Sequence, residues 1–265
     1  MDNPAVLVEA RKVIHSATRI VFFTGAGMSA ESGIPTFRDA LTGLWERFDP
    51  VLLASAEGYA ADPALVWGWY EWRRMKVMQA VPNAGHLAIA QFVAGNGAKQ
   101  VAVITQNVDD LHERAGSQDI THLHGSILTP RCLDCDAPAG VDWPGMVPDE
   151  PEAGRRIEPP QCVSCGGPLR PGVVWFGESL PMDSFDRATA LAHSADAFVV
   201  VGTSGVVEPA ASLVRQARQQ GARIIVIDPH PSISTREAHC WIAGSAANAL
   251  PELLDVRLPT PHPPV

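Results

Sequence analysis

Four of the five cysteines form two Cys-x-x-Cys pairs, Cys132 with Cys135 and Cys162 with Cys165. Each pair can bring two thiolates to one ion, and four thiolates fill the tetrahedral shell of Zn²⁺. The 26 residues between the pairs exceed the usual ~15–20 of such sites. Because a complete four-thiolate shell leaves no position for a reacting water, the pattern predicts one structural zinc ion. A redox role for one pair is the alternative interpretation.

A glycine-rich segment follows the first β-rich apolar run. Gly25 and Gly27 begin a G-x-G-x-x-A pattern that also contains Ala26, Ser29 and Ala30. Glycines let the backbone approach a pyrophosphate, and a helix that begins here would favour the negative charge of that group. The pattern predicts a dinucleotide-binding loop, with a tight turn that binds nothing as the alternative. The acidic residue that a dehydrogenase carries about 20 positions later is missing, which disfavours an ordinary dehydrogenase.

Two further clusters of small polar residues follow β-rich apolar runs. Ligands of open parallel sheets bind outside the carboxyl ends of the strands, so both clusters are candidates for one ligand site. The amide and carboxylate of the first suit an amide and a ribose, and the glycine and hydroxyls of the second suit phosphate or ribose. An ordinary strand-to-helix turn is the alternative for the second. The clusters are Gln106, Asn107 and Asp109, and Gly202, Thr203 and Ser204.

His122 and His124 stand two residues apart. In an extended segment both side chains would point to the same side. A histidine near its ordinary pKa of about 6.5 is a natural general base at neutral pH. Without further context, a structural role is the more frequent one for a single histidine.

The composition limits the class of protein. The 265 residues carry a formal net charge of −9 without a block of like charges, which disfavours a specific nucleic-acid binder. No apolar run reaches the ~18 residues that a membrane span needs, and the charged, amphipathic N-terminus does not resemble a signal peptide. With paired cysteines in such a chain, we expect a cytoplasmic protein. The oligomeric state is undetermined, and a monomer is compatible with the sequence.

The candidate residues need a scaffold, and the order of apolar runs predicts one. Strands apolar on both faces alternate with helical patterns, which is typical of a parallel sheet covered by helices on two sides. We therefore expect a doubly wound, Rossmann-like α/β domain. The strands are predicted at 19–24, 101–105, 197–201 and 223–227, and the helices at 4–17 and near 84–94, 185–194 and 209–220.

Two segments interrupt this alternation. Residues 40–80 are rich in Trp, Ala and helix formers and predict a helical insert, whereas residues 131–170 are rich in Pro and Gly and contain the paired cysteines. We therefore expect a discontinuous Rossmann-like domain made of residues 1–39, 81–130 and 171–257, with a zinc module inserted at 131–170.

Taken together, these residues resemble the sirtuin family over roughly residues 4–256. Sirtuins couple removal of an acyl group from protein lysine to cleavage of NAD, and they release nicotinamide and O-acyl-ADP-ribose. The resemblance makes His124 the general base that takes a proton from a ribose hydroxyl, in place of a structural histidine. It is carried by the two cysteine pairs and by GAGMSAESGIPTFR at 25–38, TQNVDDLHERAG at 105–116, HLHGS at 122–126, VVWFGE at 173–178 and VGTSGVVEPA at 201–210.

The resemblance also implies roles for the residues around NAD. Gln106, Asn107 and Asp109 would organise nicotinamide and its ribose, and the second polar cluster would hold the adenosine side. Asp228 stands where many family members have Asn, and a carboxylate can still accept hydrogen bonds from ribose hydroxyls. Ala246 resembles the small residue beside adenine. The remaining NAD-loop residues implied are Gly25, Ala26, Gly27, Ser29, Phe37 and Arg38.

Protein substrates of sirtuins bind as extended peptides, here between VVWFGE and GVVEP. Main-chain pairing of this kind tolerates varied sequences, so we expect loose selectivity along the peptide. Val174, Trp175 and Phe176 would surround the lysine stem.

Tyr70 and Arg73 resemble the Tyr-x-x-Arg pair of desuccinylase-type sirtuins (class III), where the pair lies at the floor of the acyl pocket. Residues i and i+3 share a helix face, and an arginine fork can bind a distal carboxylate. A charge-assisted hydrogen bond of ~1.5–3 kcal/mol corresponds to about a ten- to hundredfold preference for succinyl over acetyl. The small residues Ala54 and Ala56 could leave room for a larger acyl group. The alternative is that Arg73 is a solvated charge, as we expect for Arg74.

The sequence thus predicts an NAD-dependent deacylase that prefers succinyl and malonyl groups and also removes acetyl. A deacetylase without acidic preference and an NAD-dependent mono-ADP-ribosyltransferase are alternatives. A non-catalytic zinc-ribbon binding module is disfavoured by the net negative charge of the chain and by the intact glycine-rich NAD loop.

Overall fold

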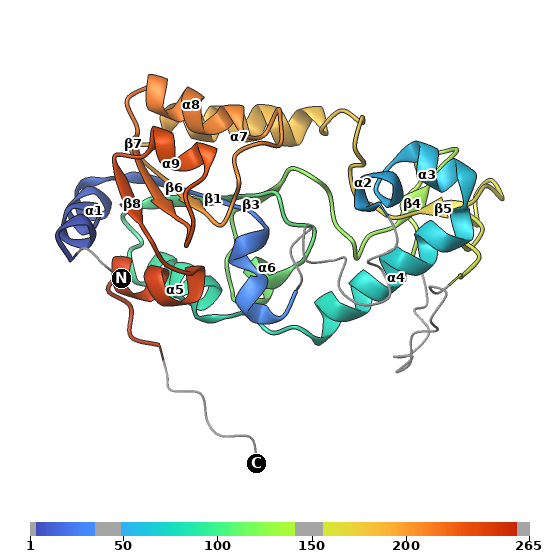
Figure 1. The fold of residues 1–265 in the computed structure, drawn as a ribbon, viewed down its shortest axis with the longest axis horizontal. Helices are drawn as coiled ribbons and strands as arrows, with labels where there is room; N and C mark the ends of the chain where they lie inside the picture. Colours follow the sequence, from blue (N-terminus) through green and yellow to red (C-terminus); the bar gives the residue numbers. More distant parts are fainter. Residues whose placement is uncertain (1–3, 35–48, 141–155, 259–265) are drawn as a thin grey trace, which may run out of the picture.

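The computed structural model describes residues 4–34, 49–140 and 156–258 (Figure 1). Its centre is a six-stranded sheet in the order β3-β2-β1-β6-β7-β8, and all neighbouring strands in it are parallel. Such a sheet needs a crossover after each strand, which explains the alternation of strands and helices. The strands are β1 (Arg19–Thr24), β2 (Gln100–Thr105), β3 (Ile120–His122), β6 (Ala197–Val201), β7 (Arg223–Ile227) and β8 (Cys240–Ile242).

The sheet is buried on both faces because successive side chains alternate between two hydrophobic clusters. In β1, Ile20 and Phe22 belong to one cluster and Val21 and Phe23 to the other. Helices α1 (Pro4–Ser16), α5 (Ala84–Gly95) and α10 (Ala246–Leu253) supply residues to the first cluster, and α7 (Met182–Ser194) and α8 (Ser212–Gln219) to the second. In Figure 1, α7 and α8 lie above the sheet and α5 lies below it.

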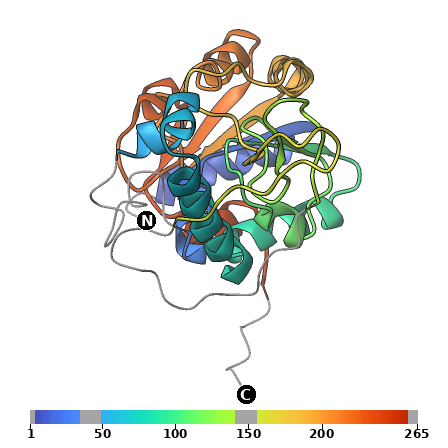
Figure 2. The same cartoon turned by 90° about the vertical axis from the view of Figure 1, so that its right-hand side faces the viewer.

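A small lobe lies beside the sheet. It consists of α2 (Pro50–Leu53), α3 (Ala56–Ala61), α4 (Pro63–Gln79), β4 (Arg131–Cys132) and β5 (Leu169–Arg170), the last two being antiparallel. The side chain of Asp62 caps α4 by accepting from the backbone N–H of Leu65 at 3.1 Å, and Pro63 occupies the first turn, where its missing N–H costs nothing. Figure 2 turns this lobe toward the viewer, with α3 and α4 in front of the sheet.

The predicted Rossmann-like sheet is confirmed, and its four predicted strands are β1, β2, β6 and β7. The structure adds β3 and β8 at the two edges and the helix α10. The exact boundaries of the discontinuous domain and its inserts stay a prediction. No helix among the described residues is both long and apolar enough to span a membrane.

Candidate active site

The carboxyl ends of β1, β2, β6 and β7 open into a cavity of about 1190 Å³ that also reaches α4 of the small lobe. The cavity brings together nearly all the residues predicted to bind NAD or the acyl-lysine, from eight separate stretches of the chain. Phe37 and Arg38 lie outside the described residues. The predicted residues that line the cavity are Gly25, Ala26, Gly27, Ser29, Tyr70, Arg73, Gln106, Asn107, Asp109, His124, Val174, Trp175, Phe176, Gly202, Thr203, Ser204, Asp228 and Ala246.

The loops after β1 and β6 touch each other through glycine. The N–H of Gly27 donates to the carbonyl of Gly202 at 2.9 Å, and a Cβ on Gly27 would lie 2.7 Å from the Cα of Gly202. Gly202 itself has a φ of +59°, a conformation that favours glycine. These glycines therefore allow one loop to approach the other, a constraint that the sequence alone does not reveal.

The expected helix after the glycine pattern is absent from the described residues up to 34. Two short 3₁₀ turns, Ala26–Met28 and Ala30–Ser32, follow β1 instead. The second turn ends at Gly33, whose φ of +82° leaves the helical region. Two side chains that the motif analysis missed hold this loop: Asn83 donates to the carbonyl of Met28 at 2.8 Å, and Glu31 accepts from Ser245 and from the N–H of Ala247.

The first polar cluster forms one hydrogen-bonded unit under the cavity. Asn107 donates from Nδ2 to the Ser29 hydroxyl at 3.0 Å, and that hydroxyl donates to Asp109 at 2.9 Å. Burial raises the pKa of Asp109 even though Ser29 and the N–H of Leu111 donate to it. Gln106 donates to Thr203 at 2.9 Å and thereby joins the first cluster to the second.

His124 is held so that one ring nitrogen is free to accept a proton. Its Nδ1 lies 2.9 Å from the carbonyl oxygen of Gln106, which can only accept, so Nδ1 carries hydrogen and Nε2 of the neutral ring is unprotonated. Burial lowers the pKa of His124, and the hydrogen bond to Gln106 opposes this only in part. The residue is therefore a neutral imidazole at neutral pH, as a general base must be.

His122 does not share the environment of His124. Strand β3 ends at His122 and the chain bends at residues 123 and 124, so the extended geometry that would align the two side chains is absent. His122 does not line the cavity. Its ring contacts Glu113 and the backbone carbonyl of Asn107.

Tyr70 and Arg73 meet at the cavity from consecutive turns of α4. The Arg73 guanidinium lies 4.8 Å from the centre of the Trp69 ring and 5.7 Å from that of Tyr70. Burial lowers the pKa of Arg73, and burial raises the pKa of Tyr70 to about 12. Within the described part of the chain no carboxylate forms an ion pair with Arg73. The cavity thus contains a partly desolvated cation that faces aromatic rings.

The expectation that Arg74 is a solvated charge is wrong. Its side chain is 2% exposed and forms an ion pair with Glu71 at 3.2 Å. Arg73 and Arg74 are separated by about 100° around a helix of 3.6 residues per turn, so the two face different surroundings. Of the two small residues expected near the acyl group, Ala54 lines the cavity and Ala56 does not.

The segment at 173–178 is fixed against both neighbouring loops. The N–H of Val174 donates to the carbonyl of His124, and that of Phe176 donates to the carbonyl of Ala54, each at 2.9 Å. Glu178 accepts from the N–H of Trp175 at 2.8 Å and pairs with Arg170, which lies over the Trp175 ring. The roles of Arg170 and Glu178 have no signal in the sequence, because their partners are known only from the fold.

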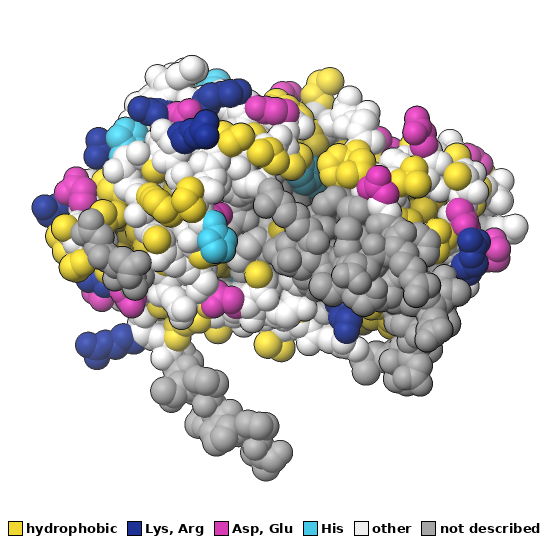
Figure 3. Space-filling view, in the orientation of Figure 1, with side chains coloured by type: hydrophobic (Ala, Val, Ile, Leu, Met, Phe, Trp, Pro, Cys, Tyr) yellow, Lys and Arg dark blue, Asp and Glu magenta, His cyan; other side chains and the backbone are white. Residues whose placement is uncertain are grey.

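Large apolar side chains remain exposed at this cavity. Phe176 is 44% exposed and Val206 is 54% exposed, and both line the cavity. In Figure 3, hydrophobic side chains are visible on the coloured surface around the grey residues. At the end of the cavity near β7, Asp228 accepts from the N–H of His230 at 2.9 Å.

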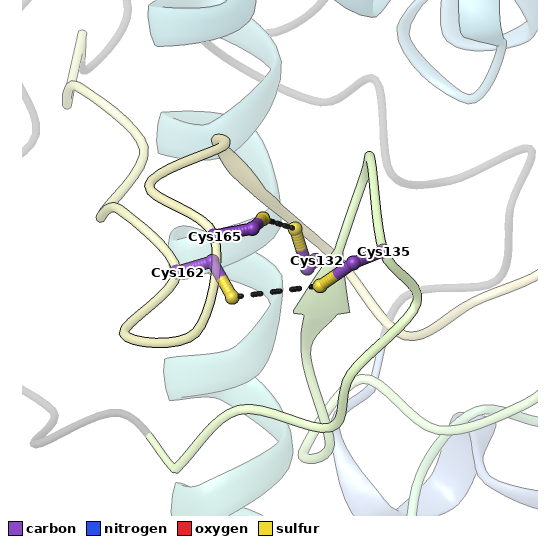
Figure 4. Close-up of side chains that lie close together, drawn as sticks. All are labelled: Cys132, Cys135, Cys162 and Cys165. Carbon is purple, nitrogen blue, oxygen red and sulfur yellow. Dashed lines mark hydrogen bonds between the residues drawn. The ribbon is translucent and has the colours of Figure 1, made fainter.

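The four paired cysteines converge at one point of the small lobe (Figure 4). All four sulfurs lie within 4.8 Å of one another, with 3.4 Å between Cys132 and Cys165 and 3.8 Å between Cys135 and Cys162. Four sulfurs at ~2.3 Å from one zinc ion would be about 3.8 Å apart, so the cluster fits a tetrahedral site of four thiolates. Backbone N–H groups of Asp134, Ser164 and Gly167 point at three of the sulfurs from 3.4 Å.

Comparisons with known proteins agree with this geometry. The model of the Sir2 family matches residues 25–209. A Pseudomonas aeruginosa protein named NAD-dependent protein deacylase 1 is 55% identical over 245 residues, which are 92% of this chain and 96% of the relative. A solved Sir2 homologue–NAD complex has a TM-score of 0.84 at 45% identity, covering 94% of this chain and 92% of that one. A structure described as Sir2 bound to acetylated peptide has a TM-score of 0.79 at 26% identity, covering 94% and 97%.

The fold and the site therefore define a sirtuin, and this chain belongs to the Sir2 family. The family resemblance and the Rossmann-like fold with a four-cysteine cluster are confirmed.

Proposed function

We propose that this chain is an NAD-dependent protein-lysine deacylase that prefers succinyl and malonyl groups and also removes acetyl. The coarser part, NAD-dependent protein deacylation, is supported by the names of its bacterial relatives and by the likeness to a Sir2 homologue–NAD complex. The likeness to a Sir2 structure with acetylated peptide supports acyl-lysine proteins as substrates.

The acyl preference rests on Arg73. This cation shares one cavity with His124, lies against Trp69 and Tyr70, and has no carboxylate partner among the described residues. Burial makes the guanidinium charge costly, and Asp109 acts on it by charge without forming an ion pair. A carboxylate on the substrate would relieve that cost. The Tyr70 hydroxyl stays protonated because burial raises its pKa to about 12, so it can add a hydrogen-bond donor.

The other residues act on NAD and on the lysine. NAD supplies the ribose carbon that receives the acyl oxygen when nicotinamide leaves, and the ribose hydroxyl that completes acyl transfer. His124 takes the proton of that hydroxyl at Nε2. Gln106, Asn107 and Asp109 orient the nicotinamide end, and the Gly202 loop with Asp228 and Ala246 holds the adenosine end. Trp175 and Phe176 enclose the lysine stem and exclude water. One zinc ion at the cysteine cluster has a structural role.

The test compares matched succinyl- and acetyl-lysine peptides with purified protein, following peptide mass and nicotinamide release. The wild type should remove succinyl faster, strictly with NAD. Arg73→Met should lower kcat/KM for the succinyl peptide about ten- to hundredfold, the equivalent of a charge-assisted hydrogen bond, and change the acetyl value little. Arg218→Met, which breaks a surface pair with Glu237, is the control. Equal losses on both peptides would contradict the acyl assignment and leave deacylation itself intact.

A further inference from the structure

The pair formed by His122 and Glu113 lies behind the nicotinamide side of the cavity. Nε2 of His122 is 2.7 Å from Oε1 of Glu113, and Nδ1 is 3.2 Å from the carbonyl oxygen of Asn107. Neither His122 nor Glu113 lines the cavity, whereas Asn107 does. The pair can therefore act on a bound ligand through the backbone of Asn107, and its charge also acts on Asp109, which lines the cavity as well.

Both partners of the His122 ring are acceptors. A backbone carbonyl has no hydrogen to donate, and an ionised carboxylate accepts only. A neutral imidazole has one N–H and can satisfy one of the two contacts, whereas an imidazolium donates from both nitrogens. The two contacts together therefore require the charged ring.

We propose that His122, as an imidazolium held by Glu113, is a positioning residue that fixes the backbone of Asn107 and so the nicotinamide end of the NAD site. The proposal rests on the proposed NAD-dependent activity for its kinetic consequences, whereas the charge on His122 can be measured without it.

Neighbouring charges agree with this state. Burial acts to lower the pKa of His122, but the hydrogen bond and the charge of Glu113, the Asn107 carbonyl and Asp109 together raise it. Burial likewise acts to raise the pKa of Glu113, and its hydrogen bond with His122 holds it below its ordinary value. The third titratable neighbour, His112, does not compete as a cation, since burial lowers its pKa to about 3.

The consequence is a specific dependence on pH. His122 is an imidazolium at pH values below its raised pKa. As the pH rises through that pKa, the ring becomes neutral and one of its two hydrogen bonds is lost. The nicotinamide site should then loosen on the alkaline side. His124 has the opposite pH dependence, because it must be neutral to accept a proton. Its protonation should therefore lower activity on the acid side.

The experiment uses the full-length protein and two variants. Glu113→Gln keeps the shape and one acceptor but removes the charge, so the alkaline limb of kcat/KM for NAD should move to lower pH. A shift of one pH unit corresponds to about a tenfold loss well above the new pKa, with near wild-type values at pH 6 and an unchanged KM for the acyl peptide. His122→Asn should abolish that limb. Glu237→Gln, in a surface pair with Arg218, is the control and should leave it in place.

A second readout does not depend on activity. NMR titration of the His122 ring in the free protein should give a pKa above 6.5 that falls in Glu113→Gln. A neutral His122 at pH 6.5, or an alkaline limb that does not move in Glu113→Gln, would overturn the proposal. If the wild type fails to deacylate, the proposed function fails, while the titration still decides the state of His122.

Discussion

Burial has opposite effects on the two kinds of ionisable group at the cavity. It raises the pKa of Asp109 and lowers that of His124, because a low-dielectric site disfavours whichever form is charged. For His124 the effect supports the proposed role, since a general base must be neutral before it accepts a proton. The hydrogen bond from Nδ1 to Gln106 selects the tautomer with a free Nε2. One residue is thus given both its charge state and its tautomer by the loop that holds it.

The acid limb of the activity profile should reflect this state. Because the pKa of His124 is lowered below the ordinary 6.5, the acid limb of kcat/KM should have its midpoint below pH 6.5. His124→Ala should lose deacylation of succinyl and acetyl peptides alike. The measurement is kcat/KM for NAD from pH 5 to 8 at saturating peptide. Half-loss of activity at or above pH 6.5 would show that burial does not control this histidine.

For single residues, the sequence predicts which residues belong to the site better than it predicts what surrounds each of them. Every described residue predicted to bind NAD or the acyl-lysine lines the cavity, because the motifs specify both type and place at strand ends. The sequence did not distinguish residues that are close in the chain but have different surroundings in the fold. His122 and His124 diverge at a bend after a three-residue strand, and Arg73 and Arg74 diverge because the inward face of α4 depends on what packs against it. Neither is contained in local sequence.

Among the elements, β1 and β6 depend on each other through their following loops. The strands are paired in register from Ile20 with Ala197 to Thr24 with Val201, so their ends are level and the two loops emerge side by side. Glycine at 25, 27 and 202 allows the contact, since a Cβ at any of them would lie within 2.8 Å of the other loop. The loop after β1, which we propose to bind NAD, is therefore positioned by the loop after β6.

Gly27→Ala should separate these loops. The added Cβ would meet backbone atoms of Gly202 at 2.7 Å, and backbone cannot move aside as a flexible side chain can. We expect at least tenfold weaker NAD binding, about 1.4 kcal/mol, measured by calorimetry, with the fold retained. Gly97→Ala is the matched control, because nothing lies within 4 Å of its Cβ position. Equal affinities in the two variants would show that the loop contact does not hold the NAD site.

The long elements could be predicted and the short ones could not. Strands β1, β2, β6 and β7 have five or six residues each, mostly apolar and buried, and such runs are recognisable in sequence. Strands β3 and β8 have three residues each, too few for a periodic pattern, and they exist because a neighbouring strand offers its edge. Helix α10 contains Pro251, a residue that argues against a helix in sequence alone.

In the whole molecule, α4 connects the cysteine cluster to the cavity. Trp67 packs with Cys132, Cys162 and Leu169 in one apolar cluster, and Tyr70, one turn further along the same helix, lines the cavity. The two large core clusters of the sheet contain no residue of α2 to α4 or of 131–170. A metal at the cysteines would therefore order the small lobe and the proposed acyl pocket, while the sheet has a core of its own.

Removal of zinc should affect the small lobe and leave the sheet domain folded. Treatment with a chelator and a reductant should release one zinc ion per chain and abolish deacylation. Tryptophan fluorescence should change strongly, since Trp67, Trp69 and Trp72 all lie on α4, whereas the far-UV circular dichroism of the sheet and its helices should largely persist. Cys165→Ala should reproduce this state, and Cys240→Ala, outside the cluster, should keep the zinc. A zinc-free protein with unchanged fluorescence and activity would mean that α4 is held by its own packing and that the metal does not support the acyl pocket.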